Sequence, residues 1–175
     1  MTDQLAPDAW AAPLPMAYDP LWARLTERVA AGRYPEAVAA ADHLESALDE
    51  DFGPLHPYTV NALTVRAWLT LLSAARTHAW AETAAHLVET TQRRRAAEAP
   101  DEETHRTLRN AHAVWTLLTS RDPETARELA GLLLPLLAAL PLEEERRRCA
   151  GAVAPWVDGG TDRDAPRPAS EHGRQ

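Results

Sequence analysis

A helix-start signal that occurs twice constrains the fold of this chain more than any other feature. Its first copy, residues 53–59, closes one segment with Gly-Pro and opens the next at Pro57. Proline suits the first position of a helix, because its missing N–H would have no partner there. A related passage, residues 99–104, returns about 45 residues later and places Leu108 where the first copy has Leu63. Recurrence at this period predicts stacked helical hairpins, an architecture that usually binds other molecules.

Composition favours helices along the whole chain. Among its 175 residues there are only 7 glycines and no isoleucine, whereas alanine and leucine dominate. Alanine and leucine are strong helix formers, and a sheet would need many more β-branched side chains. The length suits one domain with a core of its own. We therefore expect an all-α protein.

Apolar residues at helical spacing predict seven helices. The starts are marked by prolines or by acidic residues, which the positive end of a helix favours. The expected ranges are about 20–31, 35 onward, 57–74, 78–97, 101 onward, 123 onward and 143–156.

The two ends of the chain differ from this helical middle. Residues 1–17 contain three prolines and predict a flexible or loosely docked N-terminal arm. Residues 158–175 are polar and rich in glycine and proline, and they predict a disordered tail. The repeat domain is expected over residues 18–157, with the helix at 143–156 as a polar cap on its open end.

Several residues match a known repeat motif, which opens with Gly-Pro-x-His-Pro-x-Thr and continues into a helix-turn-helix. The run Gly32–Ala37 matches the hairpin turn of a preceding repeat. The residues that match the opening are Gly53, Pro54, His56, Pro57, Thr59 and Ala67. On these residues the chain resembles tetratricopeptide repeats of the kinesin-light-chain-like kind, well over residues 20–95 and more loosely over 99–140.

The resemblance implies a right-handed α-solenoid of about three helix-turn-helix repeats with a C-terminal capping helix. In many members of the family an asparagine faces the groove and holds peptide backbone. Here Val65 and Arg66 replace the Asn-Leu pair of the family, and Asn110 stands at about the equivalent position of the third repeat. Repeats of this kind also occur as sensor modules of larger regulators.

The net charge argues against nucleic acids as partners, and the hydropathy argues against a segment that spans a membrane. The formal net charge is −8, whereas general nucleic-acid binding needs a concentrated positive surface. The most apolar run, Leu129–Leu142, is shorter than a membrane span of about 20 residues. The start of the chain lacks the pattern of a signal peptide, and the single cysteine, Cys149, cannot form an internal disulfide. With heavy use of alanine, arginine and proline, this indicates a cytoplasmic bacterial protein.

Motifs for catalysis or for cofactor binding are absent from the sequence. His105 and His112 share a helix face, and His78 and His86 nearly do. Neither pair has the i, i+4 spacing with an intervening glutamate that marks a helical zinc site. The sequence contains no nucleophile elbow, no phosphate-binding glycine loop and no dinucleotide fingerprint. We expect no metal, no cofactor and no enzymatic activity.

Polar residues on the expected inner helices define a candidate binding groove. The helix over 57–74 would carry its polar side along Thr59, Ala62, Arg66, Thr70 and Ser73. Inner helices line the concave face of a solenoid, and arginine pairs bidentately with carboxylates. The expected function is therefore an adaptor or regulatory partner that captures a protein or peptide with an acidic segment. The candidate groove residues are Arg24, Arg28, Arg66, Arg106, Arg109, Asn110 and His112.

Two other function classes stay open. Trp22, Trp68, Trp80 and Trp115 are expected to fill gaps between helices. A pocket lined by tryptophans would instead indicate a small-molecule-binding accessory protein of a biosynthetic or regulatory system. The apolar region Leu129–Leu140 would suit the dimer surface of a homo-oligomeric structural protein. The sequence leaves the oligomeric state open.

Overall fold

The computed structural model of the protein describes residues 7–139, which are helical apart from short connections and contain no strand. The prediction of an all-α protein is therefore confirmed. The first six expected helices begin within about two residues of their expected starts, and the three with an expected end finish within about three residues of it. The expected seventh helix and tail, over 143–175, lie outside the described residues. The elements are the 3-10 turns η1 (Pro7–Trp10) and η2 (Met16–Tyr18) and the helices α1 (Asp19–Ala30), α2 (Tyr34–Phe52), α3 (Pro57–Thr77), α4 (Trp80–Ala96), α5 (Asp101–Arg121) and α6 (Pro123–Ala138).

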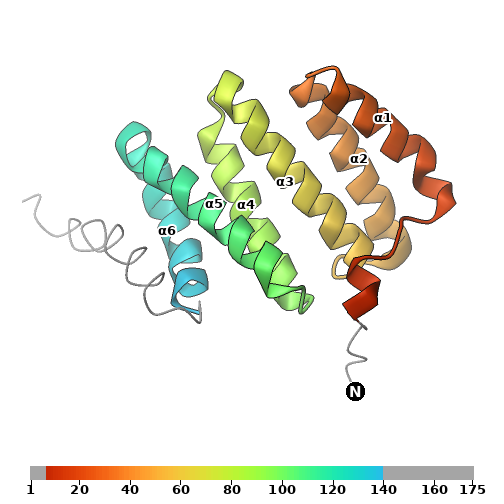
Figure 1. Cartoon of the computed structure of the whole chain (residues 1–175). Coiled ribbons are helices and arrows are strands. Elements are labelled where there is room, and N and C mark those ends of the chain that lie inside the picture. Colours follow the sequence, from red (N-terminus) through yellow and green to blue (C-terminus); the bar gives the residue numbers. More distant parts are fainter. Residues whose placement is uncertain (1–6, 140–175) are drawn as a thin grey trace, which may run out of the picture.

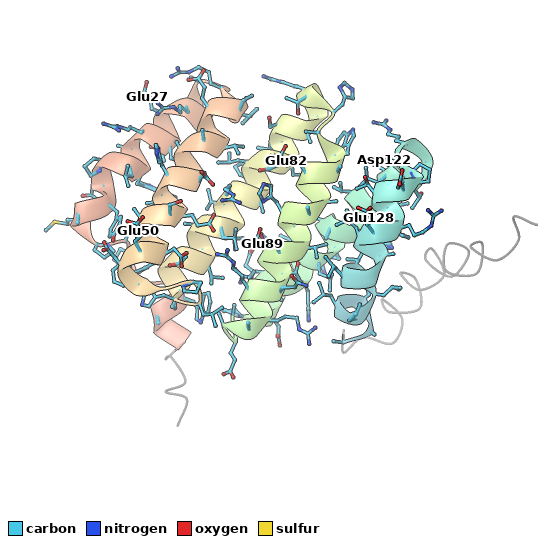
Figure 2. All side chains as sticks on the ribbon, turned by 180° about the vertical axis from the view of Figure 1, so that it is seen from behind. Glu27, Glu50, Glu82, Glu89, Asp122 and Glu128 are labelled. Atoms are coloured by element: carbon cyan, nitrogen blue, oxygen red, sulfur yellow. The ribbon has the colours of Figure 1, made fainter. Side chains whose placement is uncertain are left out.

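The six helices follow one another across the molecule as three antiparallel pairs (Figure 1). Connections of one to three residues join α1 to α2, α3 to α4 and α5 to α6. Each helix packs against the next one in the chain, and α4 also contacts α6. Figure 1 looks onto the layer of α1, α3 and α5, and Figure 2 looks from behind onto the layer of α2, α4 and α6. We call these the front layer and the rear layer.

Proline marks the start of four of the α-helices in the described part of the chain. Pro20, Pro35, Pro57 and Pro123 each occupy one of the first two positions of a helix. Their missing N–H groups fall where a helix has no acceptor for them. Helix α2 ends at Gly53, whose φ of 89° suits glycine. These residues separate the helices that periodicity alone would have run together.

The histidine of the Gly-Pro-x-His-Pro motif, His56, has a structural role at the start of α3. Its Nδ1 atom accepts the N–H of Tyr58 at 3.3 Å and caps α3. Its ring stacks on Phe52 at the end of α2, with ring centroids 4.8 Å apart. Only a neutral imidazole can accept at Nδ1, and burial lowers the pKa of His56 below its ordinary value of 6.5. One side chain therefore joins the end of α2 to the start of α3.

Two hydrophobic clusters form the core, and both include residues of α3. The first lies among α1, α2 and α3 around Leu44 and Leu48, and the second extends from α3 to α6 around Leu108 and Leu133. Alanines without exposed surface allow the helices to approach closely. These alanines are Ala37, Ala41, Ala74, Ala111 and Ala126.

The tryptophans divide into core residues and exposed residues. Trp115 is buried, as expected, and its indole N–H donates to the carbonyl of Ala126 at 2.7 Å. Trp80 packs against the same cluster. The prediction that Trp22 and Trp68 fill gaps between helices is wrong, because these side chains are 41% and 49% exposed. Both belong to helices of the front layer, α1 and α3, and Figure 1 shows no described helix in front of that layer.

The apolar sequence near the end of α6 mostly enters the core. Leu129, Leu133 and Leu137 are buried, whereas Leu132 is 51% exposed. Pro135 lies inside α6 without ending it. Within the described residues, this run therefore leaves a single large exposed leucine rather than the broad apolar surface that a dimer would need.

Residues 7–18, which we call the arm, are docked on the helices. The structure places η1 against α3 and η2 against α1. Leu14 packs against the first hydrophobic cluster, and Tyr18 is buried in it. The Tyr18 hydroxyl donates to the Asp51 carboxylate, which raises the pKa of Tyr18 to about 12. The arm therefore lies first against α3 and then against α1 before the chain enters α1.

Replacing His56 with alanine should remove the cap of α3 and the stacking on Phe52. Loss of an N-cap costs about 1 kcal/mol, so the free energy of unfolding should fall by about that amount in urea titrations followed by circular dichroism. His43→Ala, at an exposed position of α2, is the matched control and should change stability by less than about 0.5 kcal/mol. Equal effects of the two substitutions would contradict the capping role.

Mild acid should also destabilise the folded chain. Burial lowers the pKa of His56 and of His86 in the folded state below 6.5, so the unfolded chain binds protons first as the pH falls. The free energy of unfolding should therefore decrease from about pH 6.5 downward, through the folded pKa values of both groups. Urea titrations at neutral and mildly acidic pH measure this decrease. It should be smaller for His56→Ala than for His43→Ala, and an equal decrease would count against His56 as a source.

Candidate binding groove

Two neighbouring hollows share Val65 of α3 in their linings. The first hollow, of about 430 Å³, lies among the arm, α1 and α3, with Leu44 of α2 in its lining. The second, of about 280 Å³, lies between α3 and α5, with Leu87 of α4 in its lining. We call the two hollows together the front groove.

One stripe of α3 runs through both hollows. Tyr58, Asn61, Val65 and Trp68 follow one another at intervals of three or four residues, which places them on one face of the helix. Tyr58 and Asn61 line the first hollow, and Trp68 lines the second. Trp22 of α1 lines the first hollow opposite this stripe. The front groove therefore presents two exposed indole rings on either side of Val65.

The side of α3 that we expected to be polar and accessible is buried. Thr59, Thr70 and Ser73 have at most 7% of their surface exposed. The hydroxyl of Thr70 donates to the carbonyl of Arg66 at 2.9 Å, within its own helix. Because a threonine hydroxyl can be satisfied in this way, a row of threonines does not mark the outer face of a helix.

Arg66 lies on this buried side, and its expected place in the groove is wrong. Its Nη1 atom lies 2.6 Å from a carboxylate oxygen of both Asp42 and Glu45 on α2. Its Nη2 atom lies 3.0 Å from Nδ1 of His86 on α4. Arg93 of α4 holds the other oxygen of Glu45 at 3.1 Å. The charge of Arg66 is used to connect α2, α3 and α4, so it is not available to an acidic ligand.

The pKa values in this charge network follow from burial. Glu45 is only 6% exposed, and burial raises the pKa of its carboxyl while Arg66 and Arg93 oppose that rise. Burial lowers the pKa of His86, and the nearby Arg66 guanidinium lowers it further. Glu82 and Glu89, labelled in Figure 2, flank His86 on α4 at 3.7 and 3.9 Å. Each arginine of this cluster forms an ion pair with a carboxylate, and the pairs join α2, α3 and α4.

Two of the predicted groove residues lie on a different surface. Arg24 and Arg28 of α1 line a separate hollow of about 230 Å³ between α1 and α2. Arg28 donates to the carbonyl of Arg24 at 2.9 Å and lies 3.9 Å from the carboxylate of Glu36. These arginines therefore belong to the side of the first helix pair and do not reach the front groove.

Only two of the seven predicted groove residues line the front groove. Arg106 and Asn110 of α5 line the second hollow. Arg106 forms an ion pair with Glu103 at 2.8 Å, so its charge is also balanced. Arg109 and His112 are on α5 but line neither hollow, and the His112 ring stacks on Trp115.

Asn61 is a groove residue that sequence reasoning missed. Its side-chain N–H donates to the backbone carbonyl of Trp10 in the arm at 3.1 Å. Asn61 lies one helical turn before Val65, where the Asn-Leu pair of the family is replaced. Its spacing from Val65 was a usable signal, since residues four apart share one helix face. The amide therefore holds a length of backbone against α3.

A buried arginine lies beneath the arm. Arg94 of α4 is 2% exposed and donates to the hydroxyls of Thr64 and Thr104 at 3.1 and 3.2 Å. Within residues 7–139, no carboxylate lies within ion-pair distance of its guanidinium. The ring of Trp10 covers it, with the guanidinium carbon 5.7 Å from the ring centroid. Burial lowers the pKa of Arg94, since desolvation disfavours its charge.

Among the described residues, no group of three or more histidine, cysteine or acidic side chains is arranged to hold a metal ion. None of the helices in the described part of the chain is both long enough and apolar enough to span a bilayer. Comparison of the chain with protein-family models, with curated proteins and with solved structures finds no match in any of the three.

The charge network predicts how Arg66 behaves when it is removed. Arg66→Ala leaves Asp42 and one oxygen of the buried Glu45 without their cation, and we expect a loss of about 2 kcal/mol in the free energy of unfolding. Arg106→Ala removes an exposed ion pair and should cost less than about 1 kcal/mol. Urea titrations of both variants measure the difference. An Arg66 variant as stable as the Arg106 variant would contradict a structural role for the network.

Proposed function

We propose that the chain is a tetratricopeptide-like, right-handed solenoid of three hairpins whose front groove binds a segment of a partner protein without catalysing a reaction. The observation that carries this proposal is the exposure of Trp22 and Trp68 in two hollows that adjoin at Val65. Indole rings supply large contact area at low conformational cost and are frequent centres of binding energy. An adaptor or regulatory role in the bacterial cytoplasm is part of the same proposal.

The succession of helix pairs supports the repeat interpretation. The motif at residues 53–59 starts the second pair, and its histidine, prolines and glycine each have a defined role in the turn between α2 and α3. Fully buried alanines let neighbouring helices nest closely, as stacked hairpins require. The two hollows lie between helices of successive pairs, where a solenoid would bind an elongated ligand.

The charges in the groove favour an apolar partner segment over an acidic one. The acidic segment was expected because Arg66 was placed in the groove, and Arg66 is neutralised by Asp42 and Glu45. The groove's own charged residues, Asp19, Glu103 and Arg106, do not form a positive surface. We therefore propose a partner segment with aromatic or aliphatic anchors and few charges.

A small-molecule role is the second candidate, supported by the first hollow. Its volume of about 430 Å³ and its lining by Trp22 and Tyr58 fit a compact apolar molecule. A thermal-shift screen of apolar compounds against the unsubstituted chain and the Trp22→Ala variant tests it. A compound that stabilises only the unsubstituted chain would favour this second function.

The partner proposal predicts loss of capture when both exposed indoles are removed. Immobilised Trp22→Ala/Trp68→Ala chain should fail to retain a protein that the unsubstituted chain retains from lysate of the native host, because both aromatic anchors are gone. Leu117→Ala/Leu132→Ala is the matched control, since these leucines are comparably exposed but line neither hollow. Mass spectrometry identifies the retained proteins. Equal retention by both double variants would exclude the front groove as the binding surface.

A further inference from the structure

The arm lies along the first hollow of the front groove and is held against α3 in the manner of a bound peptide. Ala12, Pro13 and Leu14 form one wall of the first hollow. Upstream of them, the Trp10 carbonyl accepts a hydrogen bond from the side chain of Asn61. Peptide segments in grooves are commonly held through backbone groups in this way, with side chains adding specificity. The same chain thus supplies both a groove and an occupant.

Trp10 completes the surroundings of a buried charge. The Arg94 guanidinium donates to two hydroxyls and approaches one carbonyl. Among the described residues no carboxylate forms an ion pair with it at 4 Å or less, and Glu103 favours its charge from a greater distance. A desolvated cation gains from an aromatic face, and the ring of Trp10 is the face in cation–π range of Arg94. If the Trp10 ring were absent, the side of the Arg94 guanidinium that it covers would form a socket for another aromatic side chain.

Proline shapes the part of the arm after the socket. Pro15 has φ −59° and ψ 143°, the geometry of a polyproline II helix. Pro13 lines the first hollow together with Trp22 and Tyr58. Extended proline-containing segments dock on aromatic side chains because their backbone is already ordered.

The fit of the arm leaves room for a better occupant. A hollow of about 430 Å³, partly open to solvent, remains between residues 12–14 of the arm and the helices that line its other side. The polar and π contacts between residues 10–14 and the helices are one hydrogen bond and one cation–π contact. A segment with larger side chains would fill space that Ala12 and Pro13 leave empty.

We propose that Trp10–Pro15 is an exchangeable internal ligand of the front groove, and that the partner segment that displaces it has the same chemistry. That chemistry is an aromatic side chain followed about three residues later by an extended, proline-containing stretch. This inference rests on the proposed function and specifies its partner class. The arm then acts as a competitor, so a partner binds only by overcoming an occupant whose effective concentration is high.

The test uses the full chain and a fluorescent peptide with the sequence of residues 7–15. Fluorescence anisotropy should show that the Trp10→Ala chain binds this peptide at least about tenfold more tightly than the unsubstituted chain, because its own arm competes less well. Adding Asn61→Ala to Trp10→Ala should weaken binding again. A peptide with alanine in place of its tryptophan should not bind either chain.

Three results would overturn the inference. One is equal binding of the peptide by the Trp10→Ala and unsubstituted chains, and another is no binding by either. The third is a Trp10→Ala chain that circular dichroism shows to be unfolded, because an exchangeable segment cannot be required for folding. If Trp22 and Trp68 still determine partner capture in any of these cases, only the internal ligand is excluded and the proposed function stands.

Discussion

The buried carboxylate of Glu45 is the interaction on which the arrangement of the first two helix pairs depends. It lies between Arg66 of α3 and Arg93 of α4, and it therefore fixes α2 against both helices of the next pair. A charge in this position costs free energy unless its partners are held in place, so the three helices have little freedom to slide past one another. The stripe of α3 that lines the front groove, with Asn61, Val65 and Trp68, lies on a different side of the helix from Arg66.

The sequence predicted the helices well because local signals determine them. Prolines at helix starts, Gly53 at a helix end and apolar spacing are all local signals in the sequence. The boundary between α2 and α3 followed from Gly53, Pro54 and Pro57. The candidate site was harder to predict because it depends on which side of α3 is covered. Both sides of this helix carry polar residues, and periodicity cannot distinguish a polar side exposed to water from one satisfied inside the protein. Arg66 was therefore assigned to the wrong face.

The residues that sequence analysis missed depend on contacts between distant parts of the chain. Asn61 holds the carbonyl of Trp10, which is 51 positions away in sequence. No local pattern shows that the arm returns to cross α3. The exposure of Trp22 and Trp68 was missed for a related reason, since tryptophan is more often buried than exposed and the sequence does not show that the front layer lacks a covering helix. The sequence placed candidate residues on α1, α3 and α5, but it could not show which side chains of these helices line the two hollows.

Arg94 connects the groove to a turn of the main chain. The Arg94 guanidinium, which packs against the Trp10 ring, also donates a hydrogen bond to the hydroxyl of Thr104 in α5. It approaches the carbonyl of Pro100 in the connection between α4 and α5. This turn joins the second helix pair to the third. The ring that packs on Arg94 therefore lies next to the point where the chain passes from one pair to the next, so the arm is tied to that junction as well as to α3.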